Sequence, residues 1–116
     1  MTPEEILSCP AKILSPRDRE QYFEHGYVGA PAMVSGEWLE RLQTCAQRYV
    51  DESRNVDETD KRFDLEPDHT AEEPRIRRLN SPVDVDDLFW EFASTGPFVD
   101  VAEDLLGPNI KFHHSK

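Results

Sequence analysis

The sequence predicts an α+β fold that is mostly helical, with a few short strands. Three observations support this prediction. Apolar residues recur at three- and four-residue spacing along several stretches, Ser, Pro and Gly stand where helices begin and end, and alternating apolar positions occur only in short segments. The chain has 116 residues, which fits one domain of about 100–200 residues.

The composition limits what this domain can bind. The chain has 24 acidic and 13 basic residues, a formal net charge of −11, and 37% hydrophobic residues. Nucleic acids and anionic membranes bind clustered Lys and Arg, so neither is expected as a partner. No apolar run reaches the roughly 20 residues of a membrane-spanning helix, and the first residues lack the positive charge of a signal peptide. We therefore expect a cytoplasmic protein with reduced cysteines.

Two helices are predicted in the first half of the chain. Ser15 can cap a helix whose first position is a proline, and Gly26 can adopt the left-handed conformation that ends it, which predicts a helix over residues 16–25. The strongest apolar stripe predicts a second helix over residues 36–52. Cys45 lies in that stripe, so we expect it in the core and not as a reactive thiol.

Residues 51–73 are predicted to form a long acidic loop. This stretch is rich in charge and turn formers, and only Val56, Phe63 and Leu65 are available to hold it against a core. Its carboxylates together with His69 could hold a divalent cation, but they have no EF-hand spacing. Because blocks of charge usually stay hydrated, a solvated loop is the preferred interpretation.

A basic cluster follows the loop. Arg75, Arg77 and Arg78 are the only tightly grouped basic residues in the chain. They can pair with the neighbouring Glu72 and Glu73 at the surface. They can also recognise a carboxylate or phosphate group, for which guanidinium geometry is well suited.

Two helices and a strand are predicted after the arginines. Apolar stripes bounded by Pro and Gly predict helices over about residues 83–93 and 97–106. The final "NIKFHHSK" has the alternation of a half-buried strand. Neighbours on a strand point to opposite faces, so His113 and His114 are not expected to bind one metal ion. A strand without a following turn leads us to expect that the chain is truncated.

The motifs stand in an informative order. "HGY" at residues 25–27 precedes the apolar-striped helix, an acidic variable loop follows, and "LLGPNIKFHHSK" closes the sequence at residues 105–116. This order resembles the amino-terminal part of the phytanoyl-CoA dioxygenase family, and the likeness covers nearly the whole chain.

The resemblance implies a fold and a chemistry. Complete family members are iron(II)- and 2-oxoglutarate-dependent oxygenases built on a double-stranded β-helix (cupin-like) barrel, which hydroxylate small molecules or acyl thioesters. This chain would be a single partial domain over residues 1–116, with its acidic variable loop at 51–73 and the main barrel missing. Family members bind iron through two histidines and one carboxylate. No His-x-Asp or His-x-Glu occurs here, so we expect no metal ligand, no catalytic residue and no activity from this chain alone.

The resemblance also implies two residues that bind the co-substrate. Arg78 stands where the family usually places a lysine that holds the oxo acid, with Arg77 as the alternative one residue away. Lys116 stands where some members use methionine beside the same ligand. Fe(II) and 2-oxoglutarate are the cofactors of the complete enzyme, and neither is expected to bind tightly to this chain alone. Its partners would be a small-molecule substrate and the missing carboxy-terminal barrel.

A function of a different class fits the same sequence. The chain could be a complete, small acidic helical module that binds another protein without catalysis, through the apolar faces of residues 36–52 and 83–106. A cooperative thermal transition would favour this module, and molten behaviour would favour a truncated oxygenase.

Overall fold

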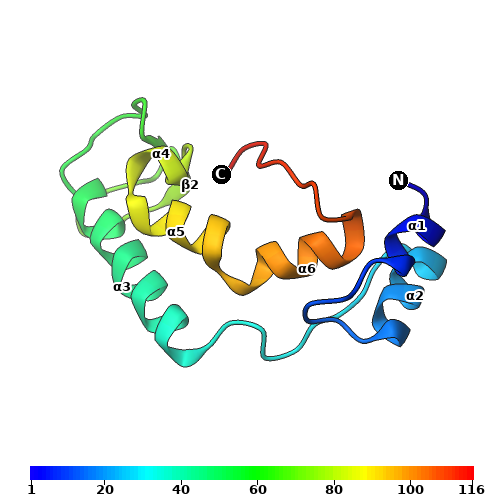
Figure 1. Ribbon diagram of the computed structural model, residues 1–116. Helices are drawn as coiled ribbons and strands as arrows, with labels where there is room; N and C mark the ends of the chain where they lie inside the picture. The colour runs from blue at the N-terminus through cyan, green and yellow to red at the C-terminus, as the bar shows by residue number, and fades with distance from the viewer. The chain divides into compact units, whose positions relative to one another are not determined.

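The computed structural model describes all 116 residues and contains six helices and one two-stranded sheet (Figure 1). The chain divides into two compact units, which the sequence does not predict within its one expected domain. Unit 1 comprises Met1–Val34 and Ala93–Phe112, and unit 2 comprises Ser35–Phe92 and His113–Lys116. The elements in chain order are α1 (Pro3–Ser8), α2 (Pro16–His25), α3 (Gly36–Ser53), β1 (Phe63–Leu65), β2 (Ile76–Leu79), α4 (Pro82–Val85), α5 (Asp87–Thr95) and α6 (Pro97–Leu106).

Local capping explains the helices of unit 1. The hydroxyl of Ser15 accepts the N–H of Asp18 and the Asp18 carboxylate accepts the N–H of Ser15, a capping box that starts α2. Gly26 ends α2 at φ 82°, and Gly107 ends α6 at φ 99°, conformations that glycine adopts without strain. The predictions of helices over residues 16–25 and 97–106 are therefore confirmed. The sequence did not predict α1.

The centre of unit 1 is polar. The Asp104 carboxylate accepts three consecutive backbone N–H groups, from Lys12 at 2.7 Å, Ile13 at 2.9 Å and Leu14 at 2.8 Å. Arg19 donates to three backbone carbonyl oxygens, those of Asp104, Cys9 and Ile6. These contacts hold the segment between α1 and α2 against α6.

The centre of unit 2 is apolar. Its buried residues are Cys45 and Tyr49 of α3 and Phe63 and Leu65 of β1. The prediction of a helix over residues 36–52 is confirmed, and the observed helix is one residue longer, ending at Ser53. Cys45 is in the core as expected. Partly buried side chains close this core, namely Val56, Ile76, Leu79, Val85, Leu88 and Phe89.

The predicted acidic loop is confirmed over residues 54–62 and 66–73 and wrong over the remaining six residues. Its first residues, Asp51 to Ser53, belong to the last turn of α3, and Phe63–Leu65 forms β1, which pairs antiparallel with β2. Phe63 is fully buried. The strand forms because two apolar side chains two residues apart face the same core, which outweighs the charge around them. Irregular structure remains on each side of β1.

Two further predictions fail at the carboxy-terminal side. The helix predicted over residues 83–93 is divided into α4 and α5, because Asp86 adopts an extended conformation at φ −145° and ψ 129°. No strand forms at "NIKFHHSK", and the sheet contains only β1 and β2. The final segment instead contacts α4, where Ser115 Oγ accepts the N–H of Val83 at 3.3 Å. No helix in this structure is both long enough and apolar enough to span a membrane.

Candidate functional site

The three clustered arginines lie on the β1–β2 hairpin, and each pairs with an acid of the same hairpin. The predicted pairing with Glu72 and Glu73 is therefore wrong. An antiparallel hairpin brings its two arms side by side, so the acids before the turn meet the arginines after it. The pairs are Arg75 Nε with Asp68 at 3.4 Å, Arg77 Nε with Glu66 at 3.1 Å, and Arg78 Nε with Asp64 at 3.1 Å.

Arg77 and Arg78 differ in how many guanidinium nitrogens contact the paired carboxylate. Arg77 donates both Nε and Nη2 to Glu66, at 3.1 and 3.2 Å, and this contact is the main cause of a lowered pKa for Glu66. Arg78 lies opposite Asp64 in the register and contacts it through Nε, while neither of its Nη atoms makes a hydrogen bond within the chain. Of the two candidates, Arg78 keeps the guanidinium edge that can take an external carboxylate.

Lys116 is exposed at the end of the chain, where Ser115 contacts α4. Lys116 has no ion-pair partner within the chain, whereas Arg78 is paired with Asp64.

The histidines do not fit an iron site. No three His, Cys, Asp or Glu side chains gather to hold a metal ion. His69 uses both ring nitrogens structurally: Nδ1 accepts the N–H of Arg75 at 2.8 Å, and Nε2 lies 2.9 Å from the carbonyl oxygen of Ser53. The His113 and His114 rings meet edge to face, with centroids 4.4 Å apart. Because the donor set of an iron centre is not present, no reaction step through iron is assigned to these residues.

A cleft in unit 2 presents a denser group of polar side chains. It measures about 760 Å³ and lies between the last turns of α3, the residues before β1, and the turn from β2 to α4. Tyr49 lines it, with the guanidinium carbons of Arg48 and Arg62 at 5.0 and 6.0 Å from the ring centroid. This arrangement places two cations against one aromatic ring.

Carboxylates hold both arginines in place. Arg48 pairs with Asp86 through Nη2, and Arg62 Nη1 donates to Glu52 Oε2 at 2.6 Å. The Tyr49 hydroxyl donates to Asp86 Oδ2 at 2.9 Å. Asp86 also accepts the N–H of Leu88 at 2.9 Å, so one carboxylate caps the start of α5 and ties it to α3.

This geometry shifts two pKa values in opposite directions. The hydrogen bond from the Leu88 N–H is the main cause of a lowered pKa for Asp86, and the Tyr49 hydroxyl adds to it against the opposing effect of burial. Burial is the main cause of a raised pKa for Tyr49, and its hydrogen bond to Asp86 adds to it. Tyr49 is therefore a neutral donor and Asp86 an ionised acceptor at neutral pH.

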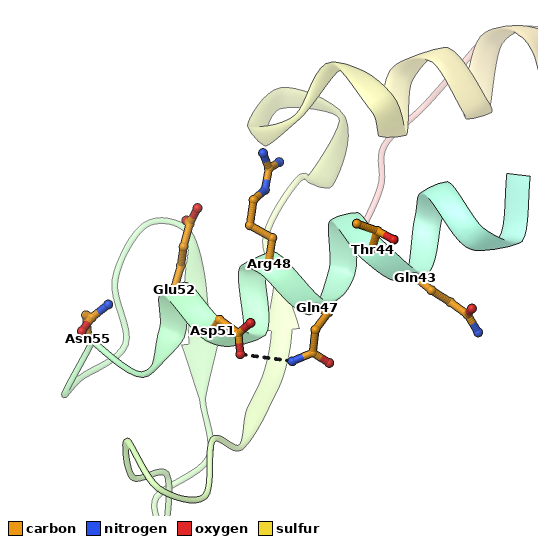
Figure 2. Close-up of a pocket in the computed structure, with 7 residues that line it drawn as sticks. All are labelled: Gln43, Thr44, Gln47, Arg48, Asp51, Glu52 and Asn55. Carbon is orange, nitrogen blue, oxygen red and sulfur yellow. Dashed lines mark hydrogen bonds between the residues drawn. The ribbon is translucent and has the colours of Figure 1, made fainter.

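The polar face of α3 forms a second, shallower hollow of about 800 Å³, drawn in Figure 2. Its side chains come from successive turns of one helix and the residue positions just after it, and Gln47 Nε2 donates to Asp51 Oδ1 at 3.1 Å. Figure 2 also shows Arg48 extending from α3 toward the segment of α4 and α5 that carries its partner Asp86. Side chains along one helix face do not converge on a ligand, so the cleft around Tyr49 is the stronger candidate.

Three residues of this cleft, Arg48, Arg62 and Asp86, are not predicted from the sequence. One local signal pointed to Asp86, since an aspartate two residues before Leu88 can cap a new helix and so divide the predicted one. Arg48 and Arg62 reach the same ring from separate elements, which no local pattern predicts. No protein-family model, curated protein or solved structure matches this chain, so a functional assignment rests on these contacts and on the sequence pattern.

Proposed function

We propose that this chain is the amino-terminal region of a non-haem iron(II)/2-oxoglutarate-dependent dioxygenase that resembles the phytanoyl-CoA dioxygenase family. The order of elements is the observation that supports this proposal most. A helix ends at Gly26 within "HGY", an apolar-striped helix and an acidic segment follow, and a later helix ends at Gly107 within "LLGPNI". We expect the complete enzyme to be cytoplasmic and, from the family resemblance, to act on a small molecule or an acyl thioester.

The proposed role of this region is to bind the co-substrate. Arg78 would receive a carboxylate of 2-oxoglutarate on its two Nη groups, and Lys116 would add a second cation. The chemistry of the complete enzyme would be oxidative decarboxylation of the oxo acid to succinate with hydroxylation of an aliphatic C–H bond. Iron ligands would come from the carboxy-terminal barrel, because this chain has no His-x-Asp or His-x-Glu. The region alone would therefore be inactive.

Reading the coding DNA beyond the Lys116 codon in all frames tests this proposal. It expects a frame that encodes His-x-Asp soon afterwards and a histidine followed by arginine much later. Absence of these motifs from every downstream frame would contradict it. Turnover of 2-oxoglutarate by the purified 116-residue chain with iron and ascorbate would contradict the predicted inactivity.

The role of Arg78 has its own test in the enzyme that carries the barrel. Arg78→Gln should raise the KM for 2-oxoglutarate by about tenfold or more, the effect of losing a charged hydrogen-bond donor. Arg77→Gln is the matched control, because Arg77 is committed to Glu66 on the same hairpin. Equal effects of the two substitutions would remove Arg78 from the co-substrate site.

A second candidate function is a helical interaction module without catalysis. It is supported by two leucines on the predicted docking helices, since Leu39 of α3 is 49% exposed and Leu106 of α6 is 59% exposed. A cooperative thermal transition of the 116-residue chain would favour this module over the oxygenase region.

A further inference from the structure

We infer that the cleft around Tyr49 binds a small anion through a carboxylate or phosphate group. This site is separate from Arg78, which pairs with Asp64 on the hairpin and does not line the cleft. The inference goes beyond the proposed oxygenase function and does not depend on it.

The two arginines of the cleft, Arg48 and Arg62, are held in place by carboxylates and still have hydrogen-bond donors without an acceptor. Arg48 makes all its side-chain hydrogen bonds through Nη2, and Arg62 makes its one side-chain hydrogen bond through Nη1. The Nε and the second Nη of each guanidinium have no acceptor within the chain. Arg62 is held further by the Phe63 ring, whose centroid lies 4.4 Å from its guanidinium carbon. Two pre-positioned guanidinium edges suit a planar carboxylate or a phosphate.

Two more donors line the same cleft. Lys61 makes no ion pair, although the chain carries almost twice as many acidic as basic residues. Ser81 makes no capping hydrogen bond with its hydroxyl and stands at φ 48° and ψ 60°, a conformation that is costly for a residue other than glycine. Strained residues of this kind are concentrated at ligand sites.

The free hydrogen-bond donors of the cleft favour an anionic ligand. The lining holds three cations, Arg48, Lys61 and Arg62, and three carboxylates, Glu52, Asp84 and Asp86, so its formal charges balance. Glu52 and Asp86 are each paired with one arginine, and the donors that remain free belong to the three cations. An anion would complete the hydrogen bonding of these donors. A volume of about 760 Å³ suits a small molecule and not a macromolecule.

The test titrates inorganic phosphate and, separately, succinate into the ¹⁵N-labelled 116-residue chain at low ionic strength. The backbone amide signals of Lys61, Arg62, Asn80 and Ser81 should shift in a saturable way with at least one probe. The tighter of the two probes identifies the ligand group as phosphate or carboxylate. Shifts confined to other residues with both probes would overturn the inference.

Substitutions then identify the donors. Arg62→Gln combined with Lys61→Gln should weaken binding by about tenfold or more, as expected for lost charged hydrogen bonds. Asp84→Asn should tighten it by about threefold, since it removes one exposed opposing charge. A gain of affinity cannot result from misfolding, so this variant keeps the test decisive. Unchanged affinity in both variants would overturn the inference.

Arg77→Gln is the matched control, because Arg77 lies on the same hairpin, pairs with Glu66 and does not line the cleft. It should leave binding to the cleft unchanged. Loss of binding in this variant alone would refute the cleft as the anion site.

Discussion

Unit 1 buries charged side chains at its centre, whereas unit 2 buries an apolar cluster. In unit 1, Arg19 and Asp104 are 4% and 2% exposed, less than any apolar side chain of that unit. In unit 2, Phe63 is fully buried. Hydrogen bonds to a buried charge depend on direction and protonation, while apolar contacts depend on volume. The two units should therefore fail under different perturbations.

Each unit has its own reporters. Both tryptophans of the chain, Trp38 and Trp90, belong to unit 2, so intrinsic fluorescence reports on that unit. The two cysteines are free, with Cys9 in unit 1 and Cys45 in unit 2. Burial is the main cause of a raised pKa for the Cys45 thiol, which should make its alkylation slow while unit 2 is folded.

Asp104→Ala should have the largest effect. It leaves three backbone N–H groups without an acceptor and Arg19 without its nearby negative charge, a loss of about 3–5 kcal/mol in the free energy of unfolding of unit 1. The measurement is the alkylation rate of Cys9, which should rise far more than that of Cys45. Asp104→Asn is the control that keeps the shape and removes the charge. An unchanged Cys9 rate would contradict a polar centre that stabilises unit 1.

Leu65→Ala should have the second-largest effect on stability, and this effect should fall on unit 2. Removing this side chain from the apolar cluster should cost about 2–3 kcal/mol, the lower end for a buried leucine because the hairpin can partly close the space. Urea unfolding followed by tryptophan fluorescence measures the loss. Ile13→Ala is the control, because Ile13 is 44% exposed and lies in unit 1. Equal losses would show that the reporter does not separate the units.

Local residues made much of this fold predictable. The bounds of α2 follow from Ser15 and Gly26, and the end of α6 follows from Gly107, because caps and stops act within a few residues of the helix they limit. The apolar stripe of α3 placed Cys45 in the core in the same way.

The parts that were not predicted depend on distant partners. Asp104 meets Leu14 across 90 positions in the chain, and nothing local distinguishes this aspartate from the less buried acids Asp100 and Glu103 of the same helix. β1 is a strand because Phe63 joins a core formed by other elements, while the residues around it are typical of a loop. For the candidate site, the cluster of arginines on β2 was visible in the sequence. Their acidic partners were not, because those partners depend on the register between β1 and β2.

Acid should destabilise unit 1 before unit 2, because it protonates the Asp104 carboxylate at the centre of unit 1. The pKa of Asp104 is lowered in the folded chain, because the backbone N–H groups of residues 12–14 and the Arg19 charge outweigh the opposing effect of burial, which is the largest single influence. A folded pKa below the unfolded value means that this stabilisation is complete above about pH 3.9, the ordinary aspartate value, and is lost as pH falls through the folded pKa.

The measurement follows the amide signals of Lys12, Ile13 and Leu14 by NMR during an acid titration, with tryptophan fluorescence as the reporter of unit 2. The amide signals should change at a pH where fluorescence still reports a folded unit 2. The effect should be smaller than that of Asp104→Ala, since a protonated carboxyl still accepts hydrogen bonds. Simultaneous loss of both signals would refute independent responses of the two units.

Tyr49→Phe should cost about 1 kcal/mol, the net contribution of one hydrogen bond. It removes the hydroxyl that donates to Asp86 at 2.9 Å but keeps the ring in the apolar cluster. Asp86 retains the Leu88 N–H and Arg48, so the cap of α5 should persist. The measurement is the urea midpoint by tryptophan fluorescence, with Tyr22→Phe in unit 1 as the control. A loss as large as that of Leu65→Ala would mean that Asp86 depends on Tyr49 for its position.

Arg77→Gln should produce the smallest effect, with no measurable change in the urea midpoint of unit 2. Arg77 and Glu66 form a two-point ion pair, yet their side chains are 50% and 33% exposed, so water and salt screen the attraction. The pair lies on the solvent side of a hairpin whose other side holds Phe63 and Leu65 in the core. A measurable loss would show that hairpin ion pairs, and not the apolar cluster alone, hold β1 against β2. Unit 2 would then depend on directed polar contacts in the way that unit 1 does.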